Sequence, residues 1–545
     1  MSAVEQLRHA VELGLDADLR AVLGPTPPIG AIWDLTYAHD DLQTARAIAE
    51  RRTLVSAQSF SPSEWLRILR ALPEEVWGPR ATTSRGWVAR IAETAAGLSQ
   101  MSSESRLHAT EASGDAPMLD VMSLLFNAIM LARIQTLIKA SGAGADLVSD
   151  PNYALPYTSP EGPKQEALRI FDERVQQSDL LQFAGSELTH PPTLTHAPPF
   201  LVYRFERTII PVPMQLTLVH EGKATITNGR YGSLAFGIDS LVDFAQRARA
   251  SSVSWWDDVS RACLALMMLL PAIFQRNPES KVSAYDAGYF EMDRERLRNE
   301  IAASIKEMPP LVSSRYNPLG LPTDPAKILK VLEAGHGSLW PLSPGPPVRN
   351  ELDRVLVDLP TVSRRFETGL AYPSDQGAVA NLRADFFEEN VRAVLARSAW
   401  APSGELEKHV GRELRRKGEL ITDLDAAGER DGVALLVNAR SKMFSLALSH
   451  GEWRPLRAQA SAARDAVREW GGRVSRLCEG PVDVGVDFSQ YRRVIALICT
   501  PSPMYSDDAE ALNEVAPGLR ACCSLLELED WLVGPGLTLT VDSLD

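Results

Sequence analysis

Residues 418–442, GELITDLDAAGERDGVALLVNARSK, hold the pattern that decides the fold of the C-terminal part of this chain. Two apolar runs flank Asp431-Gly432, a dipeptide that favours a tight turn between antiparallel strands. The first run carries Asp423 and Asp425, and the second ends in Asn438-Ala439-Arg440. We therefore predict two strands joined by a polar turn. By itself, this pattern also fits an ordinary hairpin with acidic residues near its turn.

The segments on either side of this hairpin alternate between helical and strand patterns. Apolar residues recur at helical spacing before and after it, and short apolar runs typical of buried strands follow. The order helix, strands, helix, strand indicates an α/β domain. The segments are 382–400 (helix), 418–442 (two strands), 455–474 (helix), 492–500 (strand) and 520–532 (strand, then helix).

This order, together with FFEEN at 386–390, resembles the PD-(D/E)XK nuclease superfamily, the fold of many restriction enzymes. The resemblance covers residues 376–545 and implies an α/β restriction-endonuclease-like domain. In that family one strand supplies an aspartate and the next supplies Glu-x-Lys. The two carboxylates hold Mg²⁺, which prefers oxygen ligands, and the metal and lysine activate a water molecule.

The resemblance assigns a role to each polar residue of the hairpin. Asp425 stands at the family aspartate and Asp423 beside it as a second acid, so these two are the candidate metal ligands. Glu388 matches the glutamate that the preceding helix sometimes contributes. Asn438 stands where the family has Glu, and Arg440 where it has Lys.

Asn438 and Arg440 are serious departures from the family pattern. An amide brings no charge to a metal, and an arginine is too strong a base to lose its proton and activate water. Lys442, two residues further along the same strand face, is a candidate replacement for the missing lysine. Arg440 has two predicted roles: it binds phosphate, or it pairs with Asp425 and turns a metal site into a salt bridge.

The segment 404–418, GELEKHVGRELRRKG, predicts a second helix with a basic side. Lys408, Arg412, Arg415 and Arg416 lie opposite an apolar face at helical spacing, so they are candidates for contact with a nucleic-acid backbone. A solvated surface is the alternative, because three glutamates share the segment.

The remainder of the chain predicts an α+β protein overall. Residues 1–310 form a mainly helical region with a small β insertion near 199–230, and 311–375 form a proline-rich connector. The most apolar run, 262–274, is short for a membrane span and contains Pro271, so we predict a buried helix. The polar N-terminus does not resemble a signal peptide.

Composition narrows the classes of function. The formal net charge of −14 argues against a generally basic nucleic-acid-coating protein, although a local basic face is compatible with it. Five cysteines without CxxC spacing indicate a reducing cytoplasm and no zinc site. The sequence has no GxxxxGK[ST] loop, so nothing indicates an NTPase.

Two functions from different classes follow from these observations. In the first, the chain is a non-catalytic or weakly catalytic component that binds DNA or RNA or acts as a scaffold, with protein partners at its N-terminal helices. In the second, it is an active endonuclease with a rearranged site, and Mg²⁺ is its cofactor. The resemblance suggests a bacterial defence or DNA-processing system as the setting. We expect no membrane contact.

Overall fold

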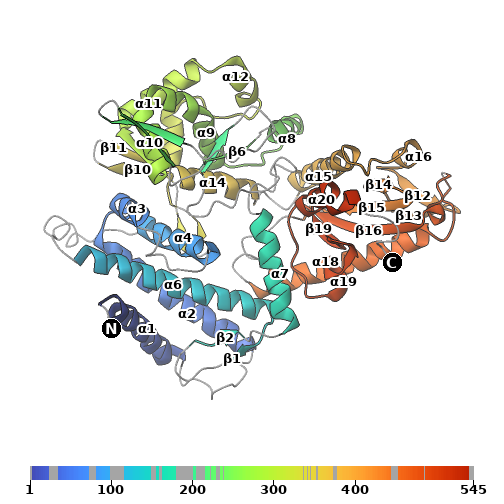
Figure 1. Cartoon of the computed structure of the whole chain (residues 1–545), viewed down its shortest axis with the longest axis horizontal. Coiled ribbons are helices and arrows are strands. Elements are labelled where there is room, and N and C mark those ends of the chain that lie inside the picture. Colours follow the sequence, from blue (N-terminus) through green and yellow to red (C-terminus); the bar gives the residue numbers. More distant parts are fainter. Residues whose placement is uncertain are drawn as a thin grey trace.

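The computed structural model has a mixed α and β architecture with several small sheets (Figure 1). Its described elements form three groups: N-terminal helices, a middle α/β unit and a C-terminal α/β unit. The residues that the structure describes are 3–23, 35–72, 82–98, 116–148, 155–158, 162–178, 200–203, 215–220, 223–228, 233–236, 239–334, 337–339, 342–343, 345–351, 354–371, 377–442, 452–483 and 485–538.

The N-terminal group is built around α6, Ala116–Ala143, whose sequence is apolar on nearly every side. Several other helices pack against α6 and bury most of its apolar side chains, for example Leu124, Leu131 and Ile138. A helix that is apolar on nearly every side is typical of a protein core. The remaining elements are α1 (Ala3–Leu23), α2 (Leu35–Ser56), η1 (Ala57–Ser59), α3 (Pro62–Ala71), α4 (Thr82–Leu98), β1 (Leu147–Val148), β2 (Tyr157–Thr158) and α7 (Pro163–Ser178).

The middle group surrounds α9, Asp258–Arg276, with a three-stranded antiparallel sheet in the order β10-β11-β7. Four short strands lie between 200 and 236, where the sequence predicts a β insertion. The elements are β3 (Phe200–Tyr203), β4 (Gln215–His220), β5 (Lys223–Asn228), β6 (Ser233–Phe236), α8 (Asp239–Ala250), α10 (Pro278–Ala287), β7 (Tyr289–Asp293), α11 (Arg294–Lys306), α12 (Pro310–Tyr316), α13 (Pro325–Glu333), β8 (Ser338–Leu339), β9 (Leu342–Ser343), β10 (Val348–Glu351), β11 (Arg354–Asp358) and α14 (Leu359–Ala371).

The proline-rich segment 311–375 is interpreted above as a connector, but its described part is folded into this middle group. Tyr316, Leu332, Val357 and Phe366 are buried in the same cluster as the apolar side of α9. Prolines open α12 and α13, where the absent N–H and preset φ favour a helix start. Two prolines therefore begin helices, and the described part of the segment belongs to the core around α9 rather than to a linker.

Two helices are long and apolar enough to cross a bilayer: Met118–Ala143 in α6 and Asp258–Arg276, which is α9. In their most apolar windows, 72% and 67% of the residues are buried against protein. Both helices supply core side chains, as the sequence predicts for 262–274.

The C-terminal group contains a four-stranded mixed sheet in the order β14-β15-β16-β19. β14 (Ala426–Arg430) and β15 (Val433–Ala439) are antiparallel, whereas β16 (Arg493–Thr500) and β19 (Cys522–Ser524) continue the sheet in parallel. The predicted turn is confirmed, since Asp431 and Gly432 both have left-handed φ values, 50° and 83°. The other elements are α15 (Ala378–Ala396), α16 (Gly404–Glu407), β12 (Glu413–Arg416), β13 (Glu419–Asp423), α18 (Trp453–Leu477), η4 (Phe488–Gln490), α19 (Ala509–Leu512), β17 (Glu514–Ala516), β18 (Leu519–Arg520), α20 (Leu525–Val533) and α21 (Pro535–Thr538).

Alternation along β15 separates the two faces of this sheet. Val433, Leu435 and Val437 belong to the apolar cluster that also contains side chains of α15 and α20. Ala434 and Leu436 belong to the cluster on the α18 side. Because successive side chains of a strand point to opposite faces, Asn438 continues the row that faces α18.

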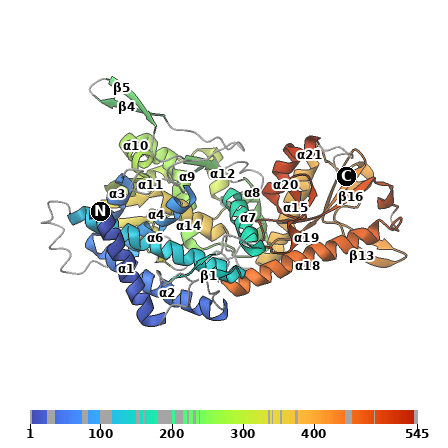
Figure 2. The same cartoon turned by 60° about the horizontal axis from the view of Figure 1, so that its bottom comes forward.

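The 25-residue helix α18 belongs to two cores at once. Its first turns bury Leu456 and Ala460 among the N-terminal helices, and its later turns bury Trp470 and Val474 against the C-terminal sheet. Figure 2 shows it running along one edge of the molecule from beneath α6 to β13. The two groups are thereby joined by a continuous, hydrogen-bonded rod.

A glycine at the centre of β14 gives a test of this packing. A β-carbon at Gly428 would lie 2.5 Å from the carbonyl oxygen of Trp400, which is backbone and cannot move aside cheaply. We expect Gly428→Ala to lower the free energy of unfolding by about 1–3 kcal/mol. Gly471→Ala is the matched control, because Gly471 lies inside α18 and a β-carbon there would have nothing within 4 Å. We expect this change to raise the free energy of unfolding by about 0.5–1 kcal/mol.

Thermal unfolding followed by circular dichroism would measure both changes. A Gly428→Ala protein that melts at the wild-type temperature would contradict the close approach of β14 to the Trp400 backbone.

Candidate functional site

Asp425 lies between the end of β13 and the start of β14, and it is buried, with 7% of its surface exposed. The register that pairs Ala426 with Val437 brings it beside Asn438. Its Oδ2 accepts two hydrogen bonds, from Asn438 Nδ2 at 2.7 Å and from the Ala439 N–H at 2.8 Å. The carboxylate is therefore held by the strand that carries the altered motif.

Asn438 links this carboxylate to Arg440. The amide oxygen accepts from Arg440 Nε at 2.8 Å, while the amide NH₂ donates to Asp425. Only one orientation of the amide satisfies both neighbours, because a guanidinium only donates and an ionised carboxylate only accepts. Arg440 therefore contacts Asp425 through Asn438, and not by the direct salt bridge considered above.

The chain of polar contacts continues onto α18. Arg440 Nη2 lies 3.0 Å from Glu469 Oε2, and Arg473 Nη2 lies 2.6 Å from Glu469 Oε1. Arg473 Nη1 in turn donates to the hydroxyl of Thr422 on β13, at 3.3 Å. The sequence pattern did not identify Glu469 or Arg473, because their role depends on how α18 crosses the sheet.

An asparagine at position 438 suits the buried Asp425 for a physical reason. A glutamate there would set a second carboxylate against Asp425 in a buried place, and like charges so close resist ionisation together unless a cation lies between them. The amide removes that repulsion and supplies a donor. An amide at position 438 therefore avoids a second buried negative charge beside Asp425.

Glu388, on α15, lies on the other side of Asp425. Arg392, one turn along, donates from Nε to the Asp425 carbonyl oxygen at 2.5 Å and from Nη2 to Glu388 at 3.2 Å. Burial, reinforced by the negative charge of Asp425, raises the pKa of Glu388 despite Arg392. Helix and hairpin thus bring together the two acids that the resemblance assigns to one site.

Burial also raises the pKa of Asp425, to about 6. The Ala439 N–H, Arg392 and Asn438 stabilise the anion and oppose this rise, whereas Asp423 adds to it. The carboxyl group therefore titrates near neutral pH in a place where water has little access.

Asp423 and Lys442 are both exposed. Asp423 ends β13 and pairs in register with Glu413 of β12. Lys442 lies past the end of β15, where its N–H donates to the Arg440 carbonyl at 2.7 Å. Neither residue has a hydrogen bond from its side chain to Asp425 among the described contacts.

The predicted magnesium site is not supported by the arrangement of donors. Within the described part of the chain, no group of three His, Cys, Asp or Glu side chains is placed to hold a metal ion. The amide oxygen of Asn438, a neutral donor that could contact a cation beside Asp425, accepts instead from Arg440. As arranged in the described structure, these residues therefore provide no complete ligand set for Mg²⁺.

The prediction of one helix over 404–418 is wrong. Only Gly404–Glu407 is helical, and Glu413–Arg416 form β12, which pairs with β13. Gly411 takes a left-handed φ of 75°, and its N–H donates to the Leu424 carbonyl, so the backbone turns into the hairpin at this point. Helical spacing therefore does not align the basic residues.

Three of the four basic residues are engaged with carboxylates. Lys408 pairs with Glu405 at 2.6 Å, Arg415 with Glu413 at 2.7 Å, and Arg416 with Glu479. Arg412 is exposed in the turn before β12. These residues form local ion pairs on the surface instead of a continuous basic stripe.

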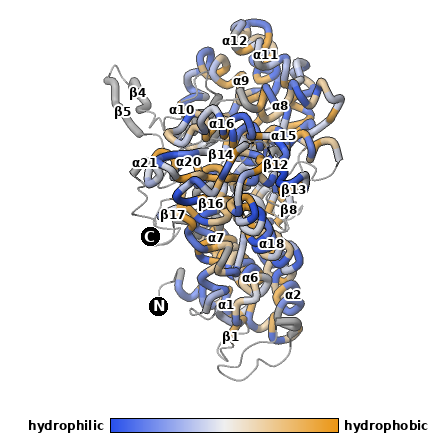
Figure 3. Tube along the Cα trace, turned by 90° about the vertical axis from the view of Figure 1, so that its right-hand side faces the viewer, coloured by the Kyte–Doolittle hydropathy of each residue, from blue (hydrophilic) through white to orange (hydrophobic). Residues whose placement is uncertain are grey.

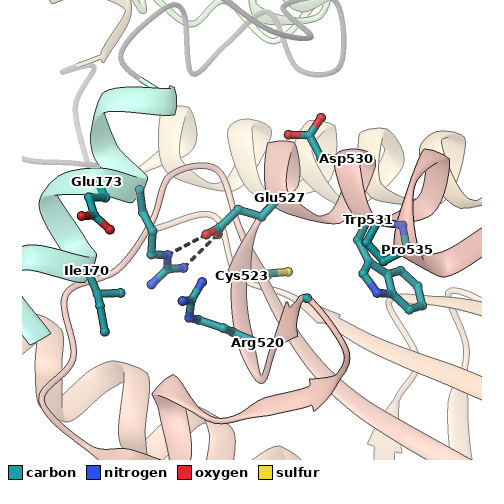
Figure 4. Close-up of a pocket in the computed structure, with 10 residues that line it drawn as sticks. Ile170, Glu173, Arg520, Cys523, Glu527, Asp530, Trp531 and Pro535 are labelled. Carbon is teal, nitrogen blue, oxygen red and sulfur yellow. Dashed lines mark hydrogen bonds and ion pairs between the residues drawn. The ribbon is translucent and has the colours of Figure 1, made fainter. Parts of the chain in front are cut away.

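A cavity of about 330 Å³ lies apart from this site, between α7 and the β18–β19–α20 segment (Figure 4). Arg174 reaches from α7 to Glu527, with Nε 2.6 Å from Oε1, and donates to the Cys522 carbonyl at 3.0 Å. Arg520 and Cys523 also line the cavity. None of its lining residues is a predicted site residue, and the Arg174 contacts beside it join the N-terminal helices to the C-terminal unit.

Comparisons of this chain with protein families, with curated proteins and with solved structures find no match.

The elevated pKa of Asp425 has a measurable consequence for stability. A carboxyl group whose folded pKa of about 6 exceeds its unfolded value of about 3.9 favours folding most below pH 4, and this contribution is lost as the pH rises through 6. Asp425→Asn cannot ionise, and its amide oxygen still accepts from Asn438 and Ala439. We expect the variant to match wild type at pH 4 and to gain on the order of 2–3 kcal/mol at pH 7.5.

Urea unfolding at the two pH values would measure this difference, with Asp431→Asn in the exposed turn as a control for the substitution itself. A variant that is less stable than wild type at pH 7.5 would mean that the Asp425 charge is compensated by its neighbours.

Proposed function

We propose that this chain is a nucleic-acid-associated protein whose C-terminal unit has a restriction-endonuclease-like fold with a non-catalytic site. The proposal rests on the two hydrogen bonds that join Asp425, Asn438 and Arg440. A carboxylate, an amide and a guanidinium satisfy one another where the family has a metal ion and a lysine.

The order of elements supports the fold part of the proposal. A helix, an antiparallel pair and a parallel strand reached through α18 follow one another, with Glu388 and Asp425 close together as the resemblance implies. The departures at Asn438 and Arg440 then have a structural use, because each takes part in the hydrogen bonds that begin at the buried Asp425.

The chemistry of phosphodiester hydrolysis supports the non-catalytic part. The reaction needs an activated water and charge compensation on the scissile phosphate. Arg440 donates to Asn438 and Glu469, and a guanidinium group in general is too strong a base to activate a water molecule. Lys442, the candidate replacement, is exposed beyond the strand end.

One observation favours the second candidate, an active Mg²⁺-dependent endonuclease. Asp425 and Glu388 both have raised pKa values, and burial contributes most to each. Buried acids of this kind cluster at catalytic sites, although structural networks produce them too. In this alternative Asp425, Asp423 and Glu388 would hold the metal after Asn438 turned away.

A cleavage assay on supercoiled plasmid and on single-stranded DNA and RNA, with Mg²⁺ or Mn²⁺, separates the two candidates. We expect wild type and Asp425→Ala to leave the substrates equally intact, while wild type still binds labelled oligonucleotides at low salt. Metal-dependent cleavage that disappears in Asp425→Ala would establish the endonuclease instead.

The proposed biological setting, a bacterial defence or DNA-processing system, follows only from the resemblance. Within it the N-terminal helices would supply contacts to protein partners. A chain that binds no nucleic acid at low salt would leave a scaffold role as the better account.

A further inference from the structure

α18 carries an unusual concentration of positive charge for a protein with a formal net charge of −14. Between Trp453 and Leu477 it has six arginines against one aspartate and one glutamate. Four of the arginines repeat at intervals of three, seven and four residues, close to whole helical turns. We call these four the arginine stripe: Arg454, Arg457, Arg464 and Arg468.

The arginine stripe lies on the side of α18 that faces solvent. Ala463, Trp470 and Val474 occupy the opposite side and are buried against the sheet. Arg454, Arg457 and Arg468 are exposed, and Arg464 is half-buried. With 1.5 Å per residue, the stripe extends for about 21 Å. Strongly hydrophilic residues are visible along this helix in Figure 3.

An exposed tryptophan stands at the start of the stripe. Trp453 is 40% exposed, and the guanidinium carbons of Arg454 and Arg457 lie 5.4 and 5.1 Å from its ring centroid. Among the residues that the structure describes, neither arginine has a carboxylate within ion-pair distance. A large aromatic side chain left at the surface with two such arginines has no role in the core to explain it.

The other half of the stripe is only loosely neutralised. Arg464 pairs with Asp465 at 3.1 Å and Arg468 with Asp508 at 3.3 Å, and both contacts are at the surface. Exposed ion pairs of this kind contribute about 0–1 kcal/mol each, so another anion exchanges with the carboxylate at little cost. The ion pairs of Arg464 and Arg468 therefore do not exclude a polyanion from the arginine stripe.

We propose that the arginine stripe and Trp453 bind a single strand of nucleic acid along α18. Guanidinium groups spaced along a rod suit successive phosphates, and an aromatic ring flanked by arginine planes suits unpaired bases, which stack on both. A duplex offers the phosphates but keeps its bases stacked, so it uses only part of this surface.

The direction of the stripe relates it to the candidate site. Arg468 adjoins Glu469, the residue that pairs with Arg440. A strand that follows the stripe from Trp453 therefore leads toward the Asp425–Asn438–Arg440 contacts. This inference rests on the proposed nucleic-acid association, but it uses none of the basic residues at 408–416.

Fluorescence anisotropy with a labelled oligodeoxythymidylate and an oligouridylate tests the inference on the full chain. At about 50 mM salt we expect Arg454→Glu with Arg457→Glu to weaken binding at least about tenfold, and to reduce the slope of log K against log salt by about 1.4. Trp453→Ala should weaken binding about fivefold or more with little change in slope, whereas Trp453→Phe should retain it.

Two controls keep the outcome interpretable. Arg8→Glu with Arg298→Glu makes the same charge change on exposed arginines of α1 and α11 and should bind as wild type does. The Arg454→Gln/Arg457→Gln variant removes the same two positive charges without adding acidic groups, and it should also bind more weakly than wild type. Circular dichroism checks the fold of each variant.

The possible results separate this inference from the proposed function. If wild type and the Arg454→Glu/Arg457→Glu variant bind oligonucleotides equally well, the inference about α18 is overturned and the proposed function stays intact. Wild type that binds no nucleic acid overturns both. Binding to vesicles of phosphatidylserine and phosphatidylcholine without binding to oligonucleotides would identify the stripe as a membrane contact and also overturn the inference.

Discussion

The sharing of α18 between two hydrophobic cores is the constraint on which the rest of this structure depends. A helix is rigid along its axis, so burying Leu456 among the N-terminal helices and Trp470 against the C-terminal sheet leaves little freedom between the two groups. The indole N–H of Trp470 also donates to the Leu436 carbonyl, at 3.1 Å, and ties the helix to β15 itself. Through this one element the position of the candidate site is linked to the N-terminal helices.

Buried charge strengthens a second junction, between the N-terminal helices and the middle unit. Arg70, on α3, pairs with Glu93 of α4 at 3.1 Å and with Asp358 at the end of β11 at 2.6 Å. Arg364 also pairs with Glu93, at 3.0 Å. Such groups are costly to bury, and removing one partner leaves another uncompensated, so they favour one relative placement of the two units over others.

The candidate site also contains a buried charged group whose partners lie within the protein. Asp425 accepts hydrogen bonds from its own sheet. Asn438 is hydrogen-bonded to both Asp425 and Arg440, and Arg440 in turn contacts Glu469 on α18. The polar side chains of this site thus satisfy one another within the described structure.

The sequence by itself determined the local features whose causes lie within a few residues. The Asp431-Gly432 turn, the alternation along β15 and the buried character of α9 depend on backbone preference and apolar periodicity, which neighbours in the chain specify. The same reasoning failed over 404–418, because Gly411 and the pairing of β12 with β13 outweighed a helical pattern. Tertiary packing alone decided that Asn438 bridges Asp425 and Arg440, that Glu469 meets Arg440, and that the proline-rich segment joins the core around α9. The Asn438 contacts depend on the register of the β14–β15 hairpin, and the contacts of Glu469 and of the proline-rich segment depend on how helices pack against distant parts of the chain, which no local pattern encodes.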